Sequence, residues 1–475
     1  MAQSSTHREG FVTPLRGSST SGTRRGEHVV IIGASMGGLV AAAAVAPFYD
    51  RVTVLERDEL PSQPAQRRGV PQGRHAHGFQ PGGLMALEKL LPGVNATLDE
   101  GGAPGGDTSA DCTWHINGHS FAQGRSGVRT IGITRPFVEH TVRTQVAALP
   151  NVTLNDQVEV RGVLSSSQTV TGVRIATGDA EVDVTADLVI DCSGRASRMP
   201  EWLTELGLPA PEEEQVHCKM AYLSRRWKLA SNEVGTDVVR VSAPNEEGKF
   251  GVCIAQEDGS HIITLGGLLN NGPENSEEAY LAFAAALPAG NFGRALQGAA
   301  PVTDLVSSHF PYSRRRRFDR LSQHPVGLIA LGDSVASFNP GYGQGMSVAA
   351  GEAVALHEHL ERGPINPKRL YKAIHKVEDV AWKISTGGDL KYEGVEGKRT
   401  PDVKIMNKYL DAYARAAEVD PVLGARFTKV AGFLAPPQSL FAPNTVWRVW
   451  RGNRKAPQVS SNPLVAHRAA TLGGK

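Results

Sequence analysis

The residues with the clearest chemical potential are the glycines of GASMGG, residues 33–38, and the acid Glu56, which follows the same turn. Glycines at this spacing let the backbone approach a pyrophosphate, and a helix N-terminus stabilises its negative charge. An acid about 20 residues further on accepts hydrogen bonds from ribose hydroxyls. Ser35 stands at the second glycine position of the G-x-G-x-x-G pattern. We therefore predict a dinucleotide site that includes Gly33, Ser35, Met36, Gly37, Gly38 and Glu56.

The segments around this motif predict a βαβ unit. Residues 28–33, HVVIIG, are a short apolar and β-branched run that ends at glycine, as a buried parallel strand does. Residues 39–48, LVAAAAVAPF, have the composition of a helix, and residues 51–56, RVTVLE, predict a second strand. The glycine turn therefore connects a strand to a helix, which is the context that the dinucleotide motif needs.

Later segments return to the same pattern. DLVIDCSGRASR, residues 187–198, and GLIALGDSVASFNPGYGQGMSVAA, residues 327–350, each predict a strand that runs into a glycine turn. Residues 128–149 predict a helix with Arg135 at its start and Pro136 in its first turn. Residues 151–190 predict a meander, residues 216–310 a second sheet, and the chain after about residue 366 is helical and basic.

With these motifs in this order, the chain resembles the FAD-dependent monooxygenases of the aromatic hydroxylase and squalene epoxidase group. The resemblance covers about residues 28–360, and within it the loop RRGVPQGRHAHG resembles the bacterial polyene epoxidases of polyether biosynthesis. The resemblance implies an α/β fold in which a Rossmann-like FAD-binding domain of discontinuous segments is joined by a β-sheet substrate domain and a C-terminal helical region.

This architecture divides the chain into seven expected parts. They are a disordered tail (1–27), FAD-binding segments (28–110, 131–200 and 313–365), a substrate-domain segment (111–130), the substrate-binding β domain (201–312) and the C-terminal helical region (366–475).

The resemblance also implies roles for individual residues. Asp333 would reach the ribityl or ribose part of FAD, and the start of the next helix would face the flavin pyrimidine, where a positive helix end stabilises an anionic reduced flavin. Arg57 would lie beside the adenosine, and Val160 would contact the adenine. Arg67 or Arg68, together with Arg135, would lie on the phosphate or flavin side. The further cofactor-binding residues are Arg57, Arg67, Arg68, Arg135, Val160, Gly194, Gly343, Gly345 and Met346.

Three other features allow less specific interpretations. His75 and His77 lack an evident third ligand, so we expect no metal; they anchor the loop near the flavin or substrate, or make ordinary loop hydrogen bonds. Residues 313–317, SRRRR, are typical of a solvated face, with an NADPH-phosphate or acidic-protein contact as the alternative. The sequence lacks the WxWxIP signature of flavin halogenases. The most similar tryptophan segment is SRRWKLAS around Trp227, so halogenation is a minor option.

The net charge, the cysteine spacing and the apolar runs indicate which kinds of partner and location to expect. A net charge of +2 over 475 residues does not favour nucleic acid or an anionic membrane as judged from global charge. The four cysteines show no metal or disulfide spacing, the first 27 residues contain no apolar signal core, and no run of 18 apolar residues occurs. We therefore expect a cytoplasmic protein without a transmembrane segment, acting on a small organic molecule.

The resemblance implies that a flavin C4a-hydroperoxide inserts one atom of O2 into the substrate, with the chemistry carried by the cofactor, so no catalytic residue is assigned. Alkene epoxidation in polyketide or terpenoid secondary metabolism is the first hypothesis and aromatic ring hydroxylation the second. A flavin-dependent double-bond reductase and a non-catalytic nucleotide-binding protein remain as alternatives. No second dinucleotide motif occurs, so NAD(P)H binds transiently at the flavin or a separate flavin reductase delivers the electrons.

Overall fold

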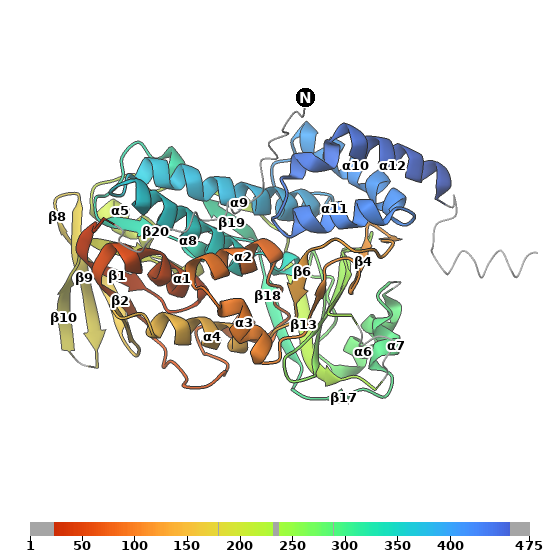
Figure 1. The fold of residues 1–475 in the computed structure, drawn as a ribbon, viewed down its shortest axis with the longest axis horizontal. Helices are drawn as coiled ribbons and strands as arrows, with labels where there is room; N and C mark the ends of the chain where they lie inside the picture. The colour runs from red at the N-terminus through yellow and green to blue at the C-terminus, as the bar shows by residue number, and fades with distance from the viewer. Residues whose placement is uncertain (1–22, 179, 231–236, 288, 457–475) are drawn as a thin grey trace, which may run out of the picture.

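The computed structural model describes residues 23–178, 180–230, 237–287 and 289–456. Most of the expected N-terminal tail, residues 1–22, and the last part of the C-terminal region, residues 457–475, lie outside this description. The chain forms a mixed α/β fold, as predicted, with two large sheets and a group of C-terminal helices (Figure 1).

The first large sheet is parallel and has the strand order β20-β11-β1-β2-β7. Its central strands read as continuous apolar runs because helices and a second layer of strands bury both faces. Four segments far apart in the sequence therefore meet in one sheet. The strands are β1 (Gly26–Ile32), β2 (Tyr49–Leu55), β7 (Val152–Asn155), β11 (Leu188–Asp191) and β20 (Leu328–Ala330).

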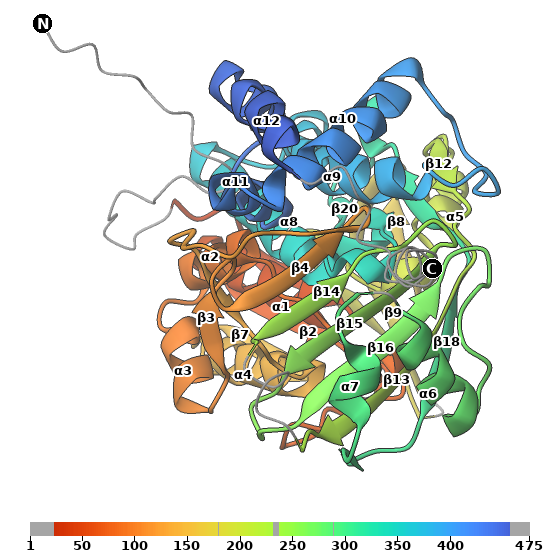
Figure 2. The ribbon, with the colours of Figure 1, turned by 90° about the vertical axis from the view of Figure 1, so that its right-hand side faces the viewer.

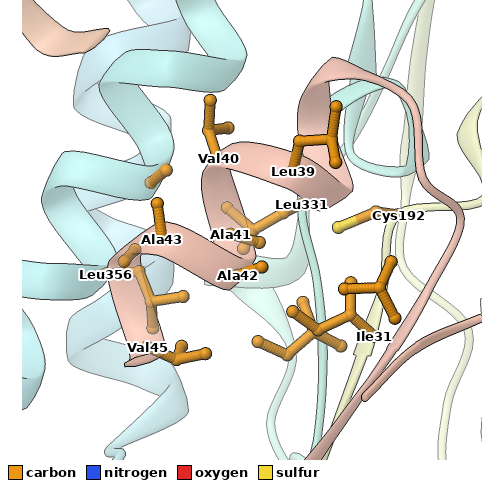
Figure 3. Close-up of a cluster of buried hydrophobic side chains, with 14 of the residues drawn as sticks. Ile31, Leu39, Val40, Ala41, Ala42, Ala43, Val45, Cys192, Leu331 and Leu356 are labelled. Carbon is orange, nitrogen blue, oxygen red and sulfur yellow. The ribbon is translucent and has the colours of Figure 1, made fainter. Parts of the chain in front are cut away.

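Helix α1 (Met36–Val45) fits tightly because its side chains are small. All of its residues except Gly37 are buried, and it lies against α8 (Gly345–Arg362) and α4 (Arg135–Ala147). Figure 3 shows Leu39 and Ala42 of α1 packed towards Ile31, Cys192 and Leu331. This packing places the N-terminus of α1 beside the ends of β1, β11 and β20.

The second large sheet has eight strands in the order β17-β13-β16-β15-β14-β4-β5, with β18 also paired to β13. Helices α6 (Glu277–Ala286) and α7 (Phe292–Leu296) cover its outer face (Figure 2). The strands are β4 (Cys112–Ile116), β5 (His119–Ser120), β13 (Met220–Lys228), β14 (Val239–Ser242), β15 (Lys249–Ala255), β16 (His261–Gly267), β17 (Ala300–Pro301) and β18 (Val306–Phe310).

Smaller strands and helices surround the parallel sheet. A meander of three antiparallel strands contacts β11 through its middle strand, helix α2 packs against α8 and helix α3 packs against α4. These elements are β8 (Glu159–Ser166), β9 (Thr169–Thr177), β10 (Ala180–Thr185), β3 (Gly105–Asp107), β6 (Arg129–Ile131), α2 (Pro81–Leu90), α3 (Val94–Glu100) and α5 (Met199–Glu205).

The interpretation of residues 313–317 as a solvated face is wrong. Residues 313–316 form β19 (Ser313–Arg316), which pairs with β12 (Glu213–Val216) and β21 (Ala336–Ser337), and the Arg315 and Arg316 residues are only 5% and 4% exposed. Glu214 lies 2.6 Å from Arg315, and Glu213 lies 3.0 Å from Arg316. The acids of the neighbouring strand therefore neutralise the guanidinium groups, which allows their burial.

The C-terminal part of the chain is helical over its described residues. It consists of α9 (Pro367–Asp389), α10 (Pro401–Ala417), α11 (Pro421–Ala431), a 3₁₀ turn (Pro437–Phe441) and α12 (Pro443–Lys455). Helices α10–α12 gather at one end of the molecule beside the eight-stranded sheet (Figures 1 and 2). Among the described residues, none of the helices is both long and apolar enough to cross a membrane.

Candidate functional site

A cavity of about 1090 Å³ begins at the carboxyl edge of the parallel sheet and continues between the eight-stranded sheet and the C-terminal helices. Its first part is lined by the turns that follow β1, β11 and β20. Ligands of open parallel sheets bind at this edge because the turns present their backbone groups and helix N-termini there. The cavity therefore joins the predicted dinucleotide site to a second, deeper chamber.

The glycines of the first turn have separate structural roles. Gly33 has a φ of +99°, and a Cβ atom there would lie 2.7 Å from the carbonyl oxygen of Cys192. A Cβ atom on Gly38 would overlap the carbonyl oxygen of Gly33. Gly37 has ordinary backbone geometry, and its nearest neighbours would be 3.9 Å away. Only Ser35, Met36 and Gly37 of this turn line the cavity, so Gly33 and Gly38 shape the turn while Gly37 opens it.

Glu56 lies behind the glycine turn and does not line the cavity. Its side chain is 6% exposed, and Oε2 accepts a hydrogen bond from the backbone N–H of Ala34 at 2.8 Å and pairs with Arg67 at 2.6 Å. Arg67 also pairs with the buried Glu139 at 2.6 Å. These ion pairs hold the turn against β2 and α4. Ribose binding by Glu56 and phosphate binding by Arg67 remain predictions.

Other arginines face the cavity near the glycine turn. Arg57 and Arg68 are exposed and line it, and no ion pair of either is found with the described residues. Arg135, at the start of α4, donates a hydrogen bond from Nη2 to Ser35 Oγ at 2.7 Å. Guanidinium groups favour phosphate geometry. This end of the cavity is therefore electropositive and suits a pyrophosphate.

Asp333 is the acid that points into the cavity. Its side chain has accessible surface although protein encloses it, and no hydrogen-bond partner of its carboxylate is found among the described residues. Burial raises the pKa of Asp333, while Arg195, Arg135 and Arg314 oppose this shift. The carboxylate is exposed to the cavity, so a ligand there can donate hydrogen bonds to it. The hydroxyls of a ribityl chain or a ribose are such donors.

The N-terminus of α8 closes the same region. Gly343 has a φ of +61° and precedes the helix, and Gly343, Gly345 and Met346 all line the cavity. Gly194, with a φ of +82°, lines it from the turn after β11. The free N–H groups of an 18-residue helix favour negative charge at this position. Val160 lies on β8 and does not line the cavity, so its contact with adenine remains a prediction.

A buried acid fixes the turn before α8. Asp389, at the end of α9, accepts hydrogen bonds from Asn339 Nδ2 at 3.0 and 3.1 Å and from the Tyr342 hydroxyl at 3.1 Å. Asn339 and Tyr342 flank the segment that leads to Gly343. The C-terminal helix α9 therefore positions backbone atoms at the end of the cavity where the flavin is expected, a link that the sequence motifs did not reveal.

We predict that this contact makes stability depend on pH. Burial raises the pKa of Asp389 to about 7, above the value of about 3.9 in an unfolded chain. Its contribution to stability is therefore present below the unfolded value and is lost as pH rises through 7. Asp389→Asn keeps an acceptor oxygen but removes the ionisation. The Tm of this variant relative to that of the wild type should rise between pH 5.5 and 8.5, measured by circular dichroism; a constant difference would contradict this role.

The loop that contains both histidines bridges the two sheets. His75 Nδ1 shares a hydrogen bond with Ser224 Oγ at 2.8 Å, and Ser224 bonds to Thr264 at 2.6 Å. His77 Nδ1 donates to the His75 carbonyl at 2.9 Å, and burial lowers the pKa of His77 to about 3. His77 is thus neutral, with Nε2 left as an acceptor. Both rings line the cavity, so the loop is a wall between the cofactor and substrate ends.

The deeper chamber is apolar and combines three parts of the chain. Asp333 is the only Asp or Glu among the described residues that line the whole cavity. Sequence reasoning did not find this chamber because its wall depends on where α9–α12 pack. It also missed Arg195, although that residue directly follows Gly194 in the motif GRASR. Residues characteristic of the chamber are Trp114, Phe121, Phe250, Phe310, Phe427 and Leu440.

The site defines a class of protein that binds a dinucleotide along the edge of a parallel sheet and holds one end of it against an apolar chamber. An orphaned enclosed carboxylate, two unpaired arginines and a helix N-terminus fit the ribityl, pyrophosphate and pyrimidine groups of FAD. The residues present therefore fit this cofactor.

Comparison with known proteins also indicates an FAD-binding protein. Residues 27–386 match the FAD binding domain family, so the chain belongs to this family and to the FAD-dependent monooxygenase superfamily. Protein Rv3254 of Mycobacterium tuberculosis (strain ATCC 25618 / H37Rv) is 31% identical over 85% of this chain and 89% of its own length. Kynurenine 3-monooxygenase of Salinispora arenicola (strain CNS-205) is 27% identical over 76% of this chain and 79% of its own length. The flavin-dependent brominase Bmp2 has the same fold, with a TM-score of 0.66 at 14% identity, covering 90% of this chain and 100% of the brominase.

Proposed function

We propose that this protein is an FAD-dependent monooxygenase that epoxidises an alkene in an apolar polyketide or terpenoid substrate. Bound FAD would activate O2, so that one atom of O2 is transferred to the alkene and the other leaves as water. The electrons come from NAD(P)H at the flavin face or from a separate flavin reductase. The resemblance of the RRGVPQGRHAHG loop to polyene epoxidases supports the substrate class.

The observation that carries the proposal is the composition of the deeper chamber. It holds mainly aromatic and aliphatic side chains, together with His309, Lys383 and Lys391, and among the described residues that line the cavity the only carboxylate is Asp333, at the other end. Burial lowers the pKa of His75 to about 4, so this imidazole is a poor proton acceptor at neutral pH. Oxygen transfer to an alkene needs no proton removed from the substrate, whereas hydroxylation of a phenol is helped by a base. The chamber therefore favours epoxidation.

The residues of the chain have three tasks in this reaction. Asp333 and the N-terminus of α8 hold the cofactor, and the His75–Ser224–Thr264 chain of hydrogen bonds keeps the histidine loop against the substrate sheet. The aromatic wall excludes water and positions the double bond. Aromatic hydroxylation stays the second candidate, because a relative of this chain carries the name kynurenine 3-monooxygenase.

The test supplies ¹⁸O2 to the purified, FAD-loaded protein with NADH, NADPH or an added flavin reductase. Linear polyenes and matched phenols serve as substrates, with and without bromide, and products are identified by mass spectrometry. We expect one labelled oxygen in an epoxide. A labelled phenol would favour hydroxylation, and bromide incorporation would favour halogenation. A saturated product formed without O2 uptake would identify a double-bond reductase, and a protein that binds no FAD would remove the proposal.

A further inference from the structure

The exposed apolar side chains are concentrated in the C-terminal helices. Thirteen large hydrophobic side chains of the described residues are exposed, and seven of them lie within residues 405–450. Among the described residues, the exposed Phe and Trp side chains are Phe441, Trp447 and Trp450, and all three are in this part. Apolar side chains scattered singly over a surface need no explanation, but a cluster of aromatic ones indicates an interaction surface.

Helix α12 has one face buried against the protein and an opposite face exposed to solvent. Thr445, Val449 and Gly452 are buried and pack towards α10, where a Cβ atom on Gly452 would meet Ala416 at 2.7 Å. Trp447 and Trp450 are 51% and 53% exposed on the other side. This amphipathic arrangement presents two tryptophans to the solvent, on a helix that lies at the end of the molecule (Figures 1 and 2).

The C-terminal helices are basic, and two of their arginines lie beside the exposed tryptophans. Residues 401–456 contain nine Lys and Arg against four Asp and Glu, so this part carries +5 in a chain whose net charge is +2. The guanidinium of Arg451 lies 5.2 Å from the Trp447 ring centroid, and that of Arg454 lies 3.8 Å from the Trp450 ring. Neither Arg451 nor Arg454 makes an ion pair with the described residues. The two arginines are therefore available to anions.

The turn before α12 lines the cavity. The 3₁₀ turn Pro437–Phe441 directly precedes α12, and Gln438, Leu440 and Phe441 line the cavity. Phe441 is also 37% exposed and stacks on Tyr409, with ring centroids 4.5 Å apart. One aromatic side chain thus belongs both to the exposed surface and to the cavity wall.

We propose that α12 and Phe441 dock on the surface of an anionic lipid bilayer, so that an apolar substrate passes from the membrane into the cavity. Tryptophans lie at the level of the lipid headgroups, and basic side chains beside them bind anionic lipids. The arrangement of Trp447, Trp450, Arg451 and Arg454 meets both requirements. The part of this inference that concerns the substrate rests on the proposed function.

The test is vesicle flotation of the full FAD-loaded protein. The probes are vesicles of phosphatidylcholine alone and vesicles of phosphatidylcholine with phosphatidylglycerol, at low and high salt. We expect binding to the anionic vesicles, weakened by salt, together with a blue shift of tryptophan fluorescence. Trp447→Ser/Trp450→Ser and Arg451→Glu/Arg454→Glu should each weaken binding about tenfold or more. FAD content should stay unchanged in both variants, because these residues lie outside the cofactor end.

The matched control is Val326→Ser, which removes an exposed apolar side chain, 62% exposed, beside the meander. This variant should bind vesicles as the wild type does. Equal loss in the control, equal binding to neutral vesicles at high salt, or no vesicle binding at all would overturn the proposal. A concentration-dependent dimer that the tryptophan variant abolishes, without vesicle binding, would instead identify a surface for a second copy. Since vesicle binding needs no turnover, its failure is distinguishable from failure of the monooxygenase assignment.

Discussion

Asp333→Ala should weaken FAD binding about 10- to 100-fold, because it removes a charge-assisted hydrogen bond worth about 1.5–3 kcal/mol. Asp333 points into the cavity, and no protein donor to its carboxylate is found among the described residues. The Kd for FAD, measured by quenching of flavin fluorescence in the apoprotein, checks this. Asp333→Asn keeps an acceptor oxygen and should lose less affinity than the alanine variant.

Asp333→Ala should not destabilise the protein in the absence of FAD. Burial raises the pKa of Asp333 above its unfolded value of about 3.9, so its contribution to stability is present below that value and is lost as pH rises through the folded pKa. At pH 8 the apo Tm of Asp333→Ala should therefore equal or exceed that of the wild type. Weaker FAD binding with an undiminished apo Tm identifies a ligand-binding residue. An unchanged Kd would remove Asp333 from the site.

Gly33→Val and Gly37→Val should both abolish FAD retention, but for different reasons. At Gly33 the positive φ and the 2.7 Å approach to the Cys192 carbonyl oxygen mean that valine strains the protein itself, by about 1–3 kcal/mol from the backbone conformation alone. At Gly37 the side chain enters the cavity, where the pyrophosphate is expected. We therefore expect a lower apo Tm only for Gly33→Val. Flavin absorbance and circular dichroism measure the two effects.

Gly162→Ala is the matched control for these variants, because nothing lies within 4 Å of the Cβ position of Gly162 on β8. It should retain both flavin content and Tm. If Gly37→Val bound FAD normally, the pyrophosphate would have to lie elsewhere. If Gly33→Val kept the wild-type Tm, the turn would have to relax without cost, contrary to the contacts with Cys192.

The elements nearest to the chemistry were predictable because their causes are local. The residues around Gly33–Gly38 form a strand, a turn and a helix through apolar runs and backbone freedom, which sequence patterns record directly. Arg135 begins α4, and the Thr134 hydroxyl caps that helix by accepting a hydrogen bond from the Phe137 N–H. Asp333 follows β20, so its position at the edge of the sheet was also predictable.

Sequence patterns did not predict the surroundings of side chains whose contacts come from distant parts of the chain. The arginines of residues 313–317 are buried because Glu213 and Glu214 lie on the paired strand about 100 positions away, and no local pattern records that pairing. Glu56 fitted the ribose pattern, yet Arg67 and Ala34 occupy one of its oxygens. A side chain with the right spacing can thus be used by the protein itself.

By itself, the sequence determined the βαβ unit, the dinucleotide turn, the order of the motifs and hence membership of the FAD-dependent monooxygenase superfamily. Periodicity and glycine placement are sufficient for the βαβ unit and the turn, because each depends on neighbours within a few turns of chain. The superfamily followed from the resemblance of the ordered motifs to those of known monooxygenases. Only the tertiary structure decided which charged groups face the cavity, how Asp389 holds the turn before α8, and that α9–α12 enclose an apolar chamber. These features are set by packing between segments from about 50 to more than 300 residues apart, where burial and long-range pairing determine which side chains remain free to meet a ligand.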